Sequence, residues 1–264
     1  MSPDLMFWFA LTIKMAVTVT FVSVATIVAE RLGATVGALV ATLPVSAGPV
    51  YVFLALDHDS AFISSSALAS LALNVATAIY ITAYVLIAQR RSLCISVSLA
   101  LAIWLGAALM LSPVHWTAAS AFILNVVVFA VCFFVVRPFC LVPVPLTKRP
   151  WYDFVVRAGL VALLVGAIVT LSFRIGPTGS GVLAVFPVIY TSIMVILHHR
   201  VGGPATAAVL ANAIPGLAGF GMALLSLYLA AVPLGSAAAL VIGLSVSVAW
   251  NATVFALRRR QGRA

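Results

Sequence analysis

Two cations stand inside apolar runs, where a charge is costly. Lys14 lies in "FALTIKMAVTV" and Arg157 lies in "WYDFVVRAGLV". A charge at the centre of a bilayer costs on the order of 3 kcal/mol on insertion scales, so such residues usually face a bundle interior or a cavity. We predict that both cations bind an anion. The alternative is that both side chains snorkel to the nearest interface, with Asp153 close enough on the same helical face to neutralise Arg157.

Polar residues surround two prolines that interrupt apolar runs, in "ATLPV" at 41–45 and "AVFPV" at 184–188. Proline removes a backbone hydrogen bond and kinks or breaks a helix. A broken helix frees carbonyl and amide groups at membrane depth, which is tolerated where they face protein or a water-filled cavity. The predicted substrate path is lined, besides the two cations, by Thr42, Pro44, Ser46, Tyr51, Pro187, Tyr190, Thr191 and Ser192. The alternative is that each proline merely kinks a packed helix.

The composition is that of a membrane protein. Of the 264 residues, 64% are hydrophobic and 7% are charged, with a mean hydropathy of +1.25, which leaves too little polar surface for a soluble globule. We expect an all-α integral protein of the plasma (inner) membrane, embedded in the lipid bilayer, with about nine transmembrane helices. The expected spans are 6–29, 33–56, 60–88, 93–112, 116–137, 152–173, 178–197, 204–231 and 234–257.

The cations predict an orientation in the membrane. Most of the 14 Lys and Arg residues sit singly or in pairs beside apolar runs, so the net charge of +9 does not indicate a nucleic-acid partner. If the spans alternate, the loop cations fall mostly on one side, and the "DHD" loop at 57–59 falls on the other. The positive-inside rule then places the N-terminus outside and the C-terminus in the cytoplasm. The tail "RRRQGR" at 258–263 is interpreted as a contact with lipid headgroups.

The chain also matches itself at an offset of 143 residues, the separation of Pro44 and Pro187. The matched pairs are Trp8 and Trp151, Lys14 and Arg157, Arg31 and Arg174, Gly33 and Gly176, Thr35 and Thr178, Pro44 and Pro187, and Val45 and Val188. We predict a duplication with an N-terminal repeat at 1–137, a cytoplasmic linker at 138–150 and a C-terminal repeat at 151–264. An odd number of helices before the second copy makes the repeats inverted (about 5+4 helices), each with a proline-interrupted second helix.

This layout resembles that of small inverted-topology-repeat secondary transporters. The resemblance implies a pseudo-two-fold axis in the membrane plane and discontinuous helices that meet near the midplane. It concerns the architecture alone and includes no family-specific motif, so no residue role is carried over from a family.

The remaining polar residues of the apolar runs favour packing over chemistry. Asparagines are interpreted as interhelical hydrogen-bonding residues, and they are Asn74, Asn125, Asn212 and Asn251. The sequence has no phosphate-binding Gly-rich loop, no HExxH motif and no nucleophile-elbow serine. Five acidic residues leave no carboxylate-rich metal cluster. We therefore expect no enzymatic activity, no cofactor and no metal site.

These observations lead to a functional expectation. The leading interpretation is a transporter or facilitator of a small anionic solute, which works by alternating access between the two halves. Two alternatives stay open: a carrier or flippase of a lipid-linked phosphate, and a non-transporting membrane scaffold subunit. A polar cavity at Pro44 and Pro187 that Lys14 or Arg157 reaches would favour transport, and a dry, closed bundle there would favour the scaffold.

Overall fold

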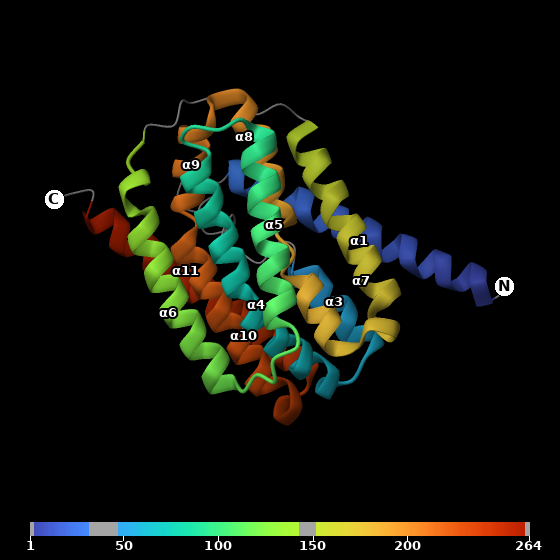
Figure 1. Ribbon diagram of the computed structural model, residues 1–264. Helices are drawn as coiled ribbons and strands as arrows, with labels where there is room; N and C mark the ends of the chain where they lie inside the picture. Colours follow the sequence, from blue (N-terminus) through green and yellow to red (C-terminus); the bar gives the residue numbers. More distant parts are fainter. Residues whose placement is uncertain (1–2, 32–46, 143–151, 262–264) are drawn as a thin grey trace.

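A computed structural model describes residues 3–31, 47–142 and 152–261 of the chain. All regular elements within these residues are helices (Figure 1). They are α1 (Pro3–Arg31), α3 (Ala47–Asp57), α4 (Ser60–Ile87), α5 (Leu93–Leu111), α6 (Ala118–Val136), the 3-10 helix η1 (Arg137–Phe139), α7 (Tyr152–Ala184), α8 (Val188–Val201), α9 (Gly203–Ala211), α10 (Ile214–Leu234) and α11 (Ser236–Gln261). The all-helical class predicted from the sequence is confirmed for the described residues.

Helix α4 forms the core of the bundle. It carries no charged residue, and most of its side chains are buried on every face. A helix that is hydrophobic all round lies in the interior of a protein or spans a membrane. Here α4 lies in the interior of the bundle, since it contacts α3, α5, α6, α7, α9 and α10.

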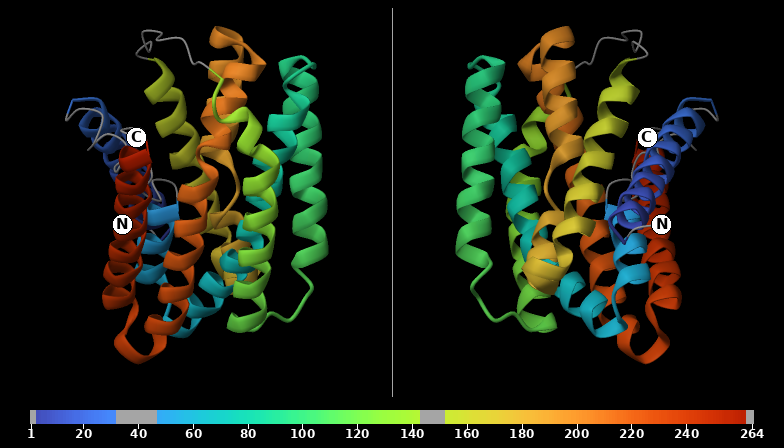
Figure 2. Two further views of the ribbon diagram at one scale, coloured as in Figure 1. Left: turned by 90° about the vertical axis from the view of Figure 1, so that its left-hand side faces the viewer. Right: turned by 90° about the vertical axis from the view of Figure 1, so that its right-hand side faces the viewer.

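The connections gather at two opposite ends of the bundle (Figure 2). The α3–α4, α5–α6 and α10–α11 connections lie at one end, which we call the DHD end because it includes the "DHD" loop at 57–59. The α4–α5 and α8–α9 connections and the C-terminal end of α11 lie at the other, which we call the arginine end. The arginine end contains Arg90, Arg91, Arg200, Arg258 and Arg260. The sequence prediction that most loop cations share one side is thus matched by the positions of these connections.

Helix α7 consists of two limbs joined at Gly176. The backbone there has φ 67° and ψ −173°, a conformation that is essentially restricted to glycine. Figure 2 shows the chain descending along the first limb to the DHD end and turning back. The second limb ends at Ala184, and α8 begins at Val188, after Pro187 with φ −80° and ψ 48°. The helix is therefore interrupted at the second of the two prolines noted in the sequence.

Seven helical segments of the described chain are long and apolar enough to cross a bilayer. They are Leu5–Val24, Ser60–Ile87, Leu93–Leu111, Ala118–Phe139, Val155–Val201, Gly203–Leu234 and Ser236–Arg258. Helix α3 is also apolar, but its 11 residues are too few to cross alone. Residues 33–46 of the predicted second span and most of the predicted linker lie outside the described residues. The class of integral membrane protein follows from these helices, whereas the count of nine stays a prediction.

Helix α1 differs from the other long helices in its direction. It runs obliquely across α7, and its N-terminal end projects beyond the bundle (Figure 1). Most of its described side chains are exposed, as expected for a helix whose apolar surface faces lipid. Its contact with α7 includes Met15, which packs against Gly166. This crossing brings the middle of α1 to the DHD end of the first limb of α7.

Candidate functional site

An ion pair joins α1 to α3 at the DHD end. The Nζ atom of Lys14 lies 2.6 Å from both carboxylate oxygens of Asp57, the last residue of α3. The two side chains are 17% and 20% exposed. The same Nζ atom lies 5.9 Å from the centroid of the Phe53 ring, within the range of a cation–π contact. Lys14, singled out from the sequence as an anion-binding cation, thus already holds an anionic group of the protein.

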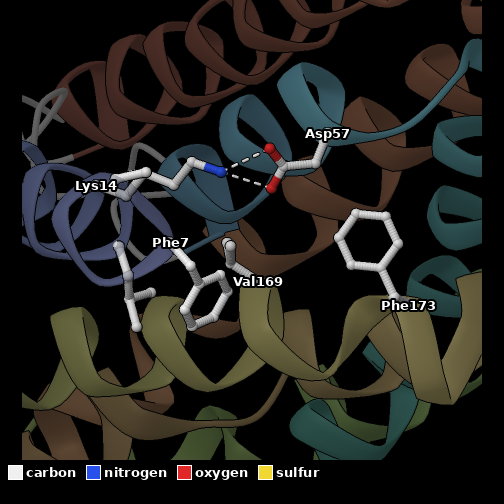
Figure 3. Close-up of a pocket in the computed structure, with 7 residues that line it drawn as sticks. Phe7, Lys14, Asp57, Val169 and Phe173 are labelled. Atoms are coloured by element: carbon white, nitrogen blue, oxygen red, sulfur yellow. Dashed lines mark hydrogen bonds and ion pairs between the residues drawn. The ribbon is translucent and has the colours of Figure 1, made fainter. Parts of the chain in front are cut away.

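The ion pair lines a cleft of about 170 Å³ between α1, α3 and α7. Figure 3 shows Lys14 and Asp57 pointing toward one another beside the aromatic rings of Phe7 and Phe173. The lining residues are Phe7, Ala10, Leu11, Lys14, Asp57, Val169 and Phe173. Apart from the two charged groups this lining is apolar. Small-molecule pockets share apolar walls with a few fixed charges, but they usually measure about 300–1,000 Å³, so this cleft has space for a small ion only.

His58, next to Asp57, fastens the α3–α4 connection to α7. Its Nε2 atom lies 2.8 Å from the Ser172 hydroxyl, which in turn lies 3.0 Å from the Val169 carbonyl. This arrangement lets Ser172 donate to the carbonyl and accept from the imidazole. The imidazole ring stacks on Phe62 at 3.8 Å. Burial lowers the pKa of His58 from 6.5, and the nearby carboxylates of Asp57 and Asp59 oppose that shift.

The residues predicted around the first proline are only partly described. Thr42, Pro44 and Ser46 lie outside the described residues. Tyr51 on α3 is buried, and its hydroxyl lies 2.6 Å from Ser70 Oγ on α4. Ser70 donates to the carbonyl of Gly181 at 2.6 Å. The phenol of Tyr51 is therefore part of a hydrogen-bonded chain between α3, α4 and α7.

Side chains of α4 pair with the chain on both sides of the interruption, from Gly181 to His198. Thr77 donates to the Val185 carbonyl at 3.1 Å, Tyr80 lies 2.7 Å from the Thr191 hydroxyl, and Tyr84 lies 2.7 Å from His198 Nδ1. We call these contacts, with that of Ser70, the α4 seam. On α4 it consists of Ser70, Thr77, Tyr80 and Tyr84. Their partners are Gly181 on α7, Val185 in the interruption, and Thr191 and His198 on α8.

The polar residues predicted after Pro187 make protein contacts. Thr191 also bonds to the carbonyl of Pro187 at 2.7 Å, and Ser192 bonds to the carbonyl of Ile189 at 2.7 Å. Tyr190 is partly buried in the same turn of α8. The Phe186 ring packs edge-on against Trp104 at 5.0 Å. Around this interruption, the hydroxyls of Thr191 and Ser192 are therefore bonded within the bundle.

Arg157 lies far from the cleft. It is partly buried on the first limb of α7, 12 residues before Val169. At 1.5 Å per residue this places the two residues ~18 Å apart along the helix. The side chain of Asp153, the partner considered from the sequence, lies outside the described part of the chain. The two predicted cations, Lys14 and Arg157, therefore lie at separate places on the bundle.

Asp57 is the site residue that sequence reasoning missed. It was assigned to an external loop, because nothing in the local pattern links it to a lysine 43 positions earlier. The sequence feature that could have found it is the scarcity of acidic residues. The chain has five, and a carboxylate at the end of one apolar segment is a natural partner for a cation inside another apolar segment. Within residues 3–31, 47–142 and 152–261, no group of three or more His, Cys, Asp or Glu side chains could hold a metal ion.

Comparisons with known proteins do not extend this description. No protein-family model, no curated protein and no solved structure matches the chain. Function is therefore argued from the cleft, the seam and the distribution of charge.

Proposed function

We propose that the protein is a membrane transporter or facilitator of a small anionic solute, which works by alternating access between two inverted halves. The observation on which this rests is the ion pair of Lys14 and Asp57 in the wall of a cleft. A cation inside an apolar helix is costly and is usually retained for a function. Here it is accessible to a solute, and it already binds a carboxylate, which is the chemistry that an anionic substrate would share.

In the proposed orientation the DHD end faces outside and the arginine end faces the cytoplasm, across the plasma (inner) membrane. The cations at the α4–α5 and α8–α9 connections and at the end of α11 support this by the positive-inside rule. The cleft then opens on the outer side. Lys14 would be the first cation that an entering anion meets.

The element boundaries support the proposal that the halves are repeats. Helix α9 begins 143 residues after α4, at Gly203 and Ser60, and α11 begins 143 residues after α5, at Ser236 and Leu93. The offset found from the matched prolines therefore extends over further elements. The paired elements also run in opposite directions between the two ends of the bundle (Figure 2).

Contacts between equivalent elements support the same proposal. Near a two-fold axis, equivalent residues meet one another. The 143-residue shift places α1 on α7 and the later part of α4 on α10. Helix α1 crosses α7, and α4 packs on α10, so two pairs of equivalent segments are in contact. The Asn74 side-chain amide donates to the Leu217 carbonyl at 3.3 Å, and these residues stand 143 positions apart. The proposed axis would pass close to this hydrogen bond.

The second half supports a preference for anions over cations. The residues that follow Lys14 and Asp57 by 143 positions are Arg157 and Arg200. Both arginines are partly buried, on α7 and α8. The ion pair of the first half thus corresponds to two cations in the second, and two cations would attract an anionic solute and repel a cationic one. In the proposed cycle the solute passes from Lys14 to these arginines.

A scaffold subunit is the second candidate, and the α4 seam favours it. The carbonyl freed by the interruption, that of Val185, is paired with Thr77 rather than with a water-filled path. A helix held in this way can serve packing alone. Transport and scaffolding differ in whether a solute crosses the membrane, so they are separated by a direct measurement.

The test is uptake of chloride, nitrate, isethionate and inorganic phosphate into proteoliposomes. For the transported anion, Lys14→Met is expected to lower uptake about tenfold or more, because a charge-assisted hydrogen bond worth roughly 1.5–3 kcal/mol is lost. Arg174→Gln, which removes an exposed cation from α7 near the same end, should keep the wild-type rate.

A folded control keeps this test interpretable. Lys14→Met leaves Asp57 without its partner, so the double variant Lys14→Met/Asp57→Asn removes both charges and should restore the melting temperature without restoring uptake. No uptake of any anion by the wild type would overturn the transporter and leave the scaffold. Full uptake by the double variant would overturn the role of Lys14.

A further inference from the structure

We propose that the proton is the coupling ion of this protein and that Asp57 is its acceptor, so that an anion replaces Asp57 on Lys14 only when Asp57 is protonated. This inference rests on the proposed function, and it assigns the pH gradient as the driving force of anion transport. The step conserves charge. A proton from water at the DHD end forms an O–H bond with the Asp57 carboxylate, and the Lys14 ammonium moves its hydrogen bonds from that carboxylate to the entering anion.

The geometry of the pair makes the two events exclusive. Both Asp57 oxygens lie 2.6 Å from Lys14 Nζ, so the carboxylate accepts the hydrogen bonds that the ammonium donates on this side. An anion that joined the pair without a proton would place two negative charges on one cation beside the apolar side chains of Phe7, Val169 and Phe173. Like charges at such distances repel strongly where the effective dielectric constant is low. Anion binding and proton binding are therefore linked, each favouring the other.

Exposure of the pair allows the exchange. Lys14 and Asp57 are 17% and 20% exposed and line a cleft of about 170 Å³. In the proposed orientation Asp57 ends α3 at the outer end of the bundle, so water of that side would deliver a proton to the carboxylate, and a small anion would have space beside the ammonium. A fully buried pair would lack both routes.

The neighbouring titratable groups fit the role of acceptor less well. On the α3–α4 connection, the His58 ring is stacked on Phe62 and bonded to Ser172 of α7, and burial together with the nearby Lys14 charge lowers its pKa, which opposes proton uptake there. Asp59 on the same connection is exposed and accepts the backbone N–H of Phe62 as the cap of α4 at 2.8 Å. From α1 the charged group that faces Asp57 is Lys14. Among these groups, Asp57 is the acid in direct contact with the cation.

The experiment uses proteoliposomes with the membrane potential clamped at zero and the same four anions as probes. An inside-alkaline pH gradient should drive accumulation, about tenfold per pH unit for a monovalent anion, since one unit is about 1.4 kcal/mol. In Asp57→Asn, which resembles the protonated acid, accumulation driven by the gradient should be lost while exchange of anion across the membrane continues. Asp59→Asn is the matched control, because asparagine also caps helices, and it should keep wild-type accumulation.

Each outcome bears on one claim. If the wild type takes up none of the anions, the transporter and this inference both fail. If the wild type takes up an anion but a pH gradient drives no accumulation, or if Asp57→Asn keeps that accumulation, proton coupling through Asp57 fails and transport stands. If Asp57→Asn does not fold, Asp57→Glu is tested in its place. This variant keeps a carboxylate, so anion uptake should still carry protons into the lumen. A pH dye trapped in the lumen measures the acidification. Uptake by folded Asp57→Glu without acidification would overturn the inference.

Discussion

The cleft beside Lys14 and the α4 seam both join polar groups from distant parts of the chain, but they differ in charge and in exposure. The cleft contains two full charges that are 17% and 20% exposed. The α4 seam contains neutral groups, and its α4 members are buried, with Thr77 only 3% exposed. Groups that water reaches can exchange partners, whereas a buried hydrogen bond is costly to leave unmade. The seam therefore packs helices, and the cleft is the place where we propose that a ligand exchanges.

The seam also explains how the chain accommodates a broken helix. In a continuous helix the Val185 carbonyl would accept from the amide of residue 189, but helical geometry stops at Ala184. Thr77 supplies the missing donor from α4. An interruption at a proline inside an apolar run is therefore compatible with a packed interior in this protein. Of the predicted path residues near Pro187, Thr191 and Ser192 are bonded to protein groups, and Lys14 lines the cleft.

The largest expected effect is at Gly181, where α7 approaches α4 most closely in the seam. A Cβ atom added there would collide with the carbonyl oxygen of Ser66. Because two backbones are in contact, no side chain can move aside, and we expect Gly181→Ala to lower the free energy of unfolding by about 3 kcal/mol. The measurement is a melting curve in detergent.

Gly159→Ala is the matched control, since it lies on the same helix and a Cβ there meets nothing within 4 Å. It should be neutral or stabilising, because alanine favours the helix over glycine. Equal melting temperatures for the two variants would contradict the close approach of α7 and α4.

A smaller effect is expected from Thr77→Val, which keeps the shape of the side chain and removes the donor to Val185. Interhelical hydrogen bonds in membranes contribute about 0.6 kcal/mol on average and at most about 1.7. A loss of about 1 kcal/mol is expected, because Trp104 also donates to the Thr77 hydroxyl, at 3.3 Å. Thr82→Val removes a hydroxyl that bonds to Ala78 within α4 at 2.9 Å and otherwise pairs with the weak thiol donor of Cys132, so it should cost less than Thr77→Val. A larger loss for Thr82→Val than for Thr77→Val would argue against the seam.

Much of the fold could be predicted from the sequence. The apolar composition predicted a membrane class, and the second proline predicted the interruption now found at Pro187. The interpretation of asparagines as interhelical hydrogen-bonding residues is confirmed at Asn74 and Asn125, which bond to each other at 3.1 Å. These features are local, because they depend on the composition of a run, the chemistry of one residue or the cost of burying an amide.

The candidate site could be predicted only in part, because it depends on contacts between distant residues. The apolar residues around Lys14 indicated that its charge is costly in a membrane. Its pairing with Asp57 depends on the oblique crossing of α1, which no local sequence pattern specifies. The seam was missed for a similar reason. Polar residues near a proline look alike in sequence whether they face water or another helix, and here α4 faces them.

The smallest expected effect is a dependence of stability on pH at His58, beside the cleft. Burial lowers the pKa of this histidine from 6.5, and Asp57 and Asp59 partly offset the shift. Below pH 6.5 the unfolded chain therefore binds a proton more readily than the folded protein does, so the free energy of unfolding falls as the pH drops through this range. His58→Gln keeps a donor for Ser172 and does not titrate. Between pH 7.5 and pH 5.5 the melting temperature of this variant should fall less than that of the wild type. The difference between the two falls should be roughly one or two degrees.

The control for this prediction is His115→Gln, in the connection between α5 and α6 at the same end of the bundle. Its side chain is exposed, so its loss removes no buried contact, and its melting curve should follow the wild type at each pH. The difference between the two variants isolates the imidazole that is stacked on Phe62 and bonded to Ser172. If His58→Gln and the wild type lose stability in parallel, the dependence on pH arises elsewhere, and His58 fastens α7 with the same strength in both of its protonation states.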